Sequence, residues 1–101
     1  MDISENITRA RSTALGYLKK APLSVGQLKT RLLRKGFTDE VAGQTISMLI
    51  ETGDLSDRTL SIHLCEKAID NGRGPRWIEQ ALARREFADD DITHCIELAR
   101  A

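Results

Sequence analysis

One segment of this sequence occurs twice, 50 residues apart, and the repeat constrains the fold more than any other feature. Residues 28–37 read LKTRLLRKGF, and residues 78–87 read IEQALARREF. The pairs that match at this constant spacing are Leu32 and Leu82, Arg34 and Arg84, Phe37 and Phe87, and Asp39 and Asp89. A gapless repeat of this kind is typical of one supersecondary unit that is used twice.

Apolar residues recur at intervals of three and four along the chain, which is the period of an amphipathic helix. Breakers interrupt the pattern at Pro22, at Gly36 and in the segment 71–75. The pattern predicts an all-α fold of six short helices, arranged as two tandem three-helix repeats at residues 8–53 and 57–101. We expect the repeats to form an elongated, right-hand-turn helical array.

Residues that cap helices stand at several predicted boundaries. Ser24, followed three residues later by Gln27, has the pattern of a capping box. Gly36 is typical of a left-handed C-cap. Thr38 and Asp57 are the predicted N-caps of the third and fourth helices.

The apolar stripes predict which side chains of each helix are buried. In the third and fourth helices the predicted core positions are Ile46, Leu49, Ile50, Leu60, Leu64, Cys65 and Ala68. In the sixth helix, Cys95 or Ile96 is predicted to face inward.

The charges are unevenly distributed, although the formal net charge is zero. Residues 1–50 hold eight Lys/Arg and four Asp/Glu, which gives +4, and residues 51–101 hold seven and eleven, which gives −4. A strong binder of duplex DNA is usually basic overall. The distribution therefore favours a partner of mixed charge, or limited contact with phosphates.

The sequence gives no signal for a membrane or secreted protein. No apolar run approaches the ~20 residues of a membrane span, and the N-terminus lacks the pattern of a signal peptide. The two cysteines fit a reducing compartment and do not form a disulfide framework. We expect a cytoplasmic protein without membrane contact.

No pattern of residues predicts an active site, a metal site or a cofactor site. His63 and Cys65, like His94 and Cys95, cannot chelate one zinc ion from a single helix, because residues two apart or adjacent point in different directions. The three carboxylates at 89–91 are explained as dipole partners and a cap at a helix start. We expect no enzymatic activity.

Four segments, in a fixed order, resemble one known family. They are Ala10–Leu18; Ser24–Phe37, with its Leu-x-x-x-Leu and Lys-Gly-Phe; GDLSD at 53–57; and GRGPRWI at 72–78. The last is the most specific, because it is similar to a Gly-x-Gly-Pro-x-x-Ile motif. The chain thereby resembles the RecX family of bacterial recombination regulators, from about Ala10 to Ala101.

The resemblance implies tandem three-helix units in a curved, elongated body. It implies a monomer that lies in the groove of the RecA filament on single-stranded DNA and lowers ATP hydrolysis and strand exchange. RecX-like proteins typically carry three repeats and this chain has room for two, which implies a shortened two-repeat member. The chain departs from the family at Glu86, where the second copy often keeps a Gly.

A basic stripe follows one flank of the second helix and recurs in the second copy. Its positions are Gln27, Arg31, Arg34 and Lys35, then Trp77, Ala81, Arg84 and Arg85. The stripe is explained either by contact with phosphates or acidic partner residues, or by a solvated face whose cations suit the helix C-terminus.

Residues 73–77 carry further candidates. Arg73 and Arg76 flank Gly74-Pro75 at a helix N-terminus and either hold a phosphate or carboxylate or belong to a turn shaped by Gly and Pro. Trp77 is a partner-facing anchor, a platform for a base, or a filler against the segment 72–75. The residues predicted to contact a partner or nucleic acid are Arg31, Arg34, Lys35, Arg73, Arg76, Trp77, Arg84 and Arg85.

Three functions remain open from the sequence. The resemblance implies a RecA-filament regulator without chemistry of its own. The alternatives are a helical module that binds single-stranded DNA directly, and a helical adaptor between proteins.

Overall fold

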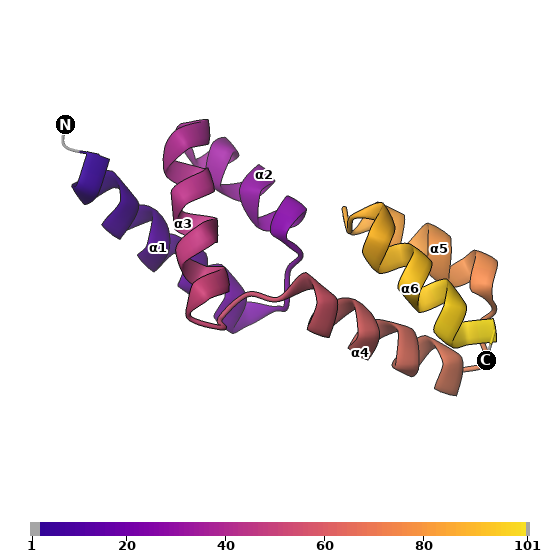
Figure 1. Cartoon of the computed structure of the whole chain (residues 1–101). Helices are drawn as coiled ribbons and strands as arrows, with labels where there is room; N and C mark the ends of the chain where they lie inside the picture. The colour runs from indigo at the N-terminus through magenta and orange to yellow at the C-terminus, as the bar shows by residue number, and fades with distance from the viewer. Residues whose placement is uncertain (1–2, 101) are drawn as a thin grey trace. The chain divides into compact units, whose positions relative to one another are not determined.

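The computed structural model describes residues 3–100, and within that range it contains six helices and no strand (Figure 1). The predicted all-α class is confirmed, and the structure is consistent with two three-helix repeats. The helices are α1 (Ile3–Lys20), α2 (Val25–Lys35), α3 (Asp39–Glu51), α4 (Asp57–Asp70), α5 (Pro75–Arg84) and α6 (Asp89–Arg100). Among the described residues, no helix is long and apolar enough to cross a membrane.

The chain divides after Leu55 into two compact units. Unit 1 contains α1, α2 and α3, which pack against one another, and unit 2 contains α4, α5 and α6. The elongated arrangement of the two repeats stays a prediction.

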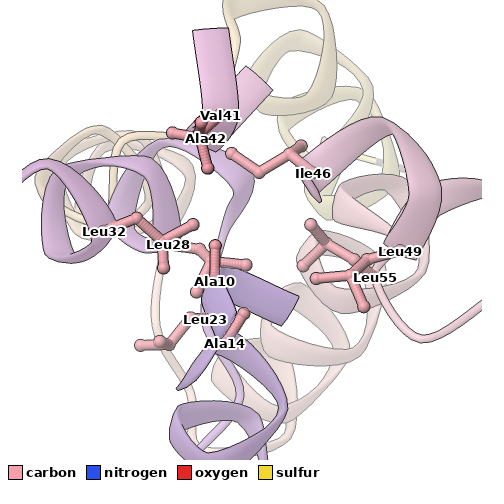
Figure 2. Close-up of a cluster of buried hydrophobic side chains, with 10 residues drawn as sticks. All are labelled: Ala10, Ala14, Leu23, Leu28, Leu32, Val41, Ala42, Ile46, Leu49 and Leu55. Atoms are coloured by element: carbon pink, nitrogen blue, oxygen red, sulfur yellow. The ribbon is translucent and has the colours of Figure 1, made fainter. Parts of the chain in front are cut away.

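The core of unit 1 is formed by buried apolar side chains from all three of its helices and from the segments that join them (Figure 2). These residues are Ala10, Ala14, Leu23, Leu28, Leu32, Val41, Ala42, Ile46, Leu49 and Leu55. The two alanines of α1 let the neighbouring helices approach its backbone closely, and the leucines fill the space between the helices.

The prediction that Ile50 faces the core is wrong, because half of its surface (50%) is exposed. Thr45 is fully buried instead. Its hydroxyl donates to the Val41 carbonyl oxygen at 2.8 Å, so a polar residue is satisfied inside the core. A search for apolar periodicity cannot identify such a position.

Among residues 3–100, the core of unit 2 contains fewer buried side chains than that of unit 1. Its buried residues are Cys65, Ala68, Ile78, Leu82, Phe87 and Cys95. On α4, Cys65 and Ala68 are buried as predicted, and on α6 the inward-facing alternative is Cys95 rather than Ile96.

Leu60 and Leu64 pack against this core as predicted, but both are only partly buried. Ser61 takes the fully buried place, with its hydroxyl donating to the Arg58 carbonyl oxygen at 3.0 Å. The buried stripe of α4 therefore runs through Ser61 rather than through the two leucines.

The N-caps follow the predicted chemistry at two of three positions. Ser24 Oγ accepts from the Gln27 N–H at 3.1 Å, and Gln27 Oε1 accepts from the Ser24 N–H at 3.1 Å, so the capping box is confirmed. Thr38 caps α3. The prediction of Asp57 as a cap is wrong: Ser56 caps α4, and Asp57 follows as the first helical residue, where its charge suits the helix dipole.

The second helix of each unit ends in the same left-handed turn. In unit 1, Gly36 has a φ of 110°, and the Phe37 N–H donates to the Leu32 carbonyl oxygen at 3.2 Å. In unit 2, Glu86 has a φ of 63°, and the Phe87 N–H donates to the Leu82 carbonyl oxygen at 3.3 Å. This pattern is the Schellman motif, so the sequence repeat is also a repeat of backbone geometry.

Candidate functional site

The predicted contact residues form two groups, one in each unit. In unit 1, the basic side chains lie on the C-terminal half of α2. In unit 2, two arginines lie at the start of α5 and two at its end, with Trp77 on the first turn. All eight are exposed: Arg31, Arg34, Lys35, Arg73, Arg76, Trp77, Arg84 and Arg85.

The group in unit 1 surrounds a tyrosine of α1. Tyr17, Arg31, Arg34 and Lys35 line a shallow cavity of about 240 Å³. The Arg31 Cζ atom lies 5.5 Å from the centroid of the Tyr17 ring, which is a cation–π contact. Sequence reasoning missed Tyr17, since nothing in the sequence sets which side chain of α1 lies beneath α2.

The group in unit 2 contains a second cation–π contact. The Arg73 Cζ atom lies 4.9 Å from the centroid of the Trp77 ring, and 41% of Trp77 is exposed. Trp77 therefore contacts a residue of the segment 72–75 and also exposes part of its ring. Each of the two alternative predictions describes part of its surroundings. Arg73 holds the ring in place and presents its own charge at the same spot.

A cavity of about 220 Å³ lies beside Trp77, between α4 and α5. Its apolar lining includes Leu64, Ile78, Ala81 and Leu82, and its charged lining residues are Lys67 and Arg85. Arg76 and Arg84 are exposed on the same helix but lie outside this lining. Of the paired basic residues at 84–85, the second is therefore the one that faces the cavity.

The cavities of the two units occupy corresponding places. Each lies between the first and second helices of its unit. At the spacing of 50 residues, Arg31 corresponds to Ala81 and Lys35 corresponds to Arg85. The same turn of helix therefore carries a large cation in unit 1 and a methyl group in unit 2.

The two cysteines lie together in unit 2, both buried and both free. Cys65 Sγ donates to the Cys95 carbonyl oxygen at 3.3 Å, and Cys95 Sγ donates to the Ser61 carbonyl oxygen at 3.3 Å. Burial raises the pKa of the Cys65 thiol to about 11, and the neighbouring Cys95 adds to this effect. Since the thiolate is the nucleophile, Cys65 at neutral pH is a structural residue.

The carboxylates at 89–91 also have a structural partner. The Asp91 carboxylate forms an ion pair with the Arg58 guanidinium at 3.2 Å, which joins α6 to α4. Within residues 3–100, no group of three or more His, Cys, Asp or Glu side chains is placed to hold a metal ion. The fold and its exposed groups define a helical module whose surface offers binding contacts.

Comparison with known proteins points to one family. Residues 10–49 match the family model described as the first three-helix domain of RecX. The chain is 30% identical over 87 residues to the regulatory protein RecX of Treponema pallidum, which covers 86% of this chain and 52% of that protein. It is 27% identical over 90 residues to the regulatory protein RecX of Leuconostoc mesenteroides, which covers 88% of this chain and 34% of that protein. No solved structure matches the chain significantly.

By both comparisons the chain is similar to the RecX family of regulatory proteins, the family that its sequence motifs resemble. It spans about half the length of the relatives from Treponema pallidum. The inference of a shortened, two-repeat member stays a prediction.

Proposed function

We propose that this protein binds the RecA recombinase filament on single-stranded DNA and lowers its ATP hydrolysis and strand exchange. The observation that carries the proposal is the match of residues 10–49 to the first three-helix domain of the RecX family. Those residues contain α2, whose exposed cations offer a surface for an acidic partner. The protein acts in this proposal by occupying a surface of the filament.

The exposed charges by themselves give modest affinity, because a single exposed ion pair contributes only about 0–1 kcal/mol. Several such contacts, or one buried anchor, are needed for stable binding. The cations of α2 offer several exposed contacts, and Trp77 offers an anchor. We therefore propose that each group contacts the partner from its own unit.

A titration with fluorescently labelled single-stranded DNA, with and without RecA and nucleotide, tests the proposal. We expect binding to the RecA-coated strand together with reduced ATP hydrolysis. We expect no binding to the bare strand at the same salt concentration. Absence of binding to the coated strand would contradict the proposal.

A charge-reversed variant makes this titration specific. Arg34→Glu combined with Lys35→Glu should weaken binding to the coated strand and restore ATP hydrolysis. Arg100→Glu is the control, since this exposed residue lies at the end of α6 and outside both groups. Equal weakening by both variants would assign the effect to general charge rather than to α2.

A second candidate function is direct binding of single-stranded DNA, which the exposed ring of Trp77 favours. Aromatic side chains beside cations are platforms on which bases stack. A salt series separates this candidate from the first. Binding to bare DNA that falls steeply with salt concentration would favour the nucleic-acid module, because phosphate contacts release counterions.

A further inference from the structure

We propose that the cavity between α4 and α5 is a docking site for one apolar side chain of an acidic protein segment. The inference rests on the proposed function, because it names the chemistry that a protein partner presents to unit 2.

The size and lining of the cavity suit one side chain. Its volume of about 220 Å³ lies below the roughly 300–1,000 Å³ typical of sites for small molecules and cofactors. Leu64, Ile78 and Leu82 contribute apolar surface to it. Transfer of a Leu, Ile or Phe side chain from water to such a surface is favourable when burial is complete.

The comparison of the two units explains why the lining of this cavity is apolar. In unit 1 the corresponding cavity is lined by three cations and Tyr17, and the Arg31 guanidinium lies over the Tyr17 ring. Its counterpart Ala81 has one methyl group and lines the cavity of unit 2. One difference between the repeats therefore replaces a guanidinium by apolar surface.

The charges at the cavity select an acidic partner. Lys67 from α4 and Arg85 from the end of α5 line it, and none of its described lining residues is a carboxylate. Residues 56–101, which form unit 2, hold seven Lys/Arg and nine Asp/Glu, so these two cations form a local positive spot in a unit that is acidic overall. Such a spot is complementary to a segment that bears Asp or Glu beside its apolar residue.

The surroundings of Trp77 favour a protein segment over a nucleic-acid base. Trp77 lines the cavity, but Arg73 already lies over its ring. A stacked base needs an open ring face, of which Arg73 leaves at most one, and the aliphatic side chains of the cavity offer no hydrogen bonds to base edges. An aromatic residue with an arginine beside an apolar pocket is typical of the anchor sites in protein interfaces.

Fluorescence provides a direct test, because Trp77 is the only tryptophan in the sequence. The probes are two synthetic peptides with the sequences Asp-Glu-Asp-Leu-Glu-Asp-Glu and Asp-Glu-Asp-Ser-Glu-Asp-Glu, both with blocked ends. We expect a saturable change in Trp77 emission with the leucine peptide and at least tenfold weaker binding of the serine peptide. Equal affinities for the two peptides, or no binding of the leucine peptide, would overturn the proposal.

The matched variant is Ala81→Arg, which places in unit 2 the residue that unit 1 carries. Arg is a good helix former, so the fold should persist, and circular dichroism checks this. Because the added charge attracts both acidic peptides alike, we expect the preference for the leucine peptide over the serine peptide to be lost. An unchanged preference, or quenching of Trp77 by an oligothymidylate in place of the peptide, would overturn the docking site.

The peptide assay contains no RecA, so the two proposals fail separately. If the leucine peptide binds and the RecA-coated strand does not, the docking site stands and the proposed function is wrong. The opposite outcome is that the Ala81→Arg variant binds the coated strand as tightly as the unsubstituted chain does and also keeps the preference for the leucine peptide. In that case the proposed function stands and the docking site is wrong.

Discussion

The turns after α2 and α5 have the same geometry but different residues at the left-handed position. Gly36 has a φ of 110° and Glu86 has a φ of 63°, and both turns close with the same pair of backbone hydrogen bonds. A glycine adopts this conformation without steric cost, whereas a residue with a side chain loses about 1–2 kcal/mol. Unit 2 therefore keeps the turn through its surrounding packing, with Phe87 buried beyond it.

The cores of the two units differ in the same direction. Among the described residues, the buried cluster of unit 1 has ten members, five of them leucines, whereas that of unit 2 has six, two of them cysteines. Thr45 of unit 1 corresponds to Cys95 of unit 2, and both bond to a backbone carbonyl from a buried position. Because stabilisation grows with buried apolar area, we infer that unit 2 is the less stable unit.

The largest effect is expected from truncating corresponding core residues. Leu28 and Ile78 are 0% and 1% exposed, so replacing either by Ala should cost about 2–5 kcal/mol. We expect Ile78→Ala to abolish protection of α4–α6 amides in hydrogen exchange while α1–α3 stay protected. We expect Leu28→Ala to leave unit 1 folded but weakened. Loss of protection in α1–α3 before α4–α6 would contradict the inferred order of stability.

The next largest effect is expected from alkaline pH, which should destabilise unit 2 and not unit 1, since the sequence places both cysteines in unit 2. The pKa of Cys65 rises from 9.0 to about 11 on folding. The unfolded thiol therefore loses its proton first, and stability is complete below pH 9 and falls between pH 9 and 11. The loss should reach at most about 3 kcal/mol, since two pKa units count about 1.4 kcal/mol each.

Circular dichroism of urea unfolding as a function of pH measures this loss. Cys65→Ala is the matched control, because it removes the titrating thiol. The pH dependence of unfolding between pH 9 and 11 should become shallower in this variant. A dependence equally steep in the variant would assign the effect to other groups.

Substitutions at the two left-handed turns should change the free energy of unfolding in opposite directions. At Gly36 an added Cβ meets no atom within 4 Å, so Gly36→Ala costs only the conformational strain, about 1 kcal/mol. Glu86→Gly removes that strain and should stabilise unit 2 by about 0.5 kcal/mol, after the greater entropy of unfolded glycine is subtracted. Gly43→Ala, inside α3 and also without a close neighbour, is the control and should stabilise. Thermal unfolding that moved in the same direction for Gly36→Ala and Gly43→Ala would contradict this explanation.

The smallest effect is expected from the more exposed of two ion pairs that join helices. Lys29 and Asp39 lie 3.9 Å apart with side chains 48% and 82% exposed, so Lys29→Ala should change stability by less than about 0.5 kcal/mol. Arg58 reaches Asp91 at 3.2 Å, and that carboxylate is only 13% exposed. Arg58→Ala should therefore cost more, about 1 kcal/mol, in urea unfolding. A larger loss of stability for Lys29→Ala than for Arg58→Ala would contradict this ranking.

Much of the fold was predictable because helix periods, breakers and caps are local signals. The capping box at Ser24 and the turn at Gly36 each depend on residues a few positions apart. The burial of Thr45 and Ser61 was not predictable, because a search for apolar residues passes over polar ones. Each hydroxyl donates to a carbonyl oxygen within its own helix, which allows the residue to be buried.

The candidate site was predictable only in part. The basic residues and Trp77 were identified from the repeat, and the substitution of Arg31 by Ala81 is visible in the sequence. The cavity depends on the distance between α4 and α5 and on Leu64 lying at the edge of the core rather than inside it. Contacts between helices of this kind follow from packing, which a single helix pattern does not encode.

The most direct test compares the two basic groups on one ligand. The affinity for RecA-coated single-stranded DNA is measured for the unsubstituted chain, for Arg34→Glu with Lys35→Glu, and for Arg84→Glu with Arg85→Glu, at one salt concentration. If both units contribute to one interface, each double substitution weakens binding at least tenfold while the helical content is unchanged. Binding by both variants as tight as that of the unsubstituted chain would contradict the account.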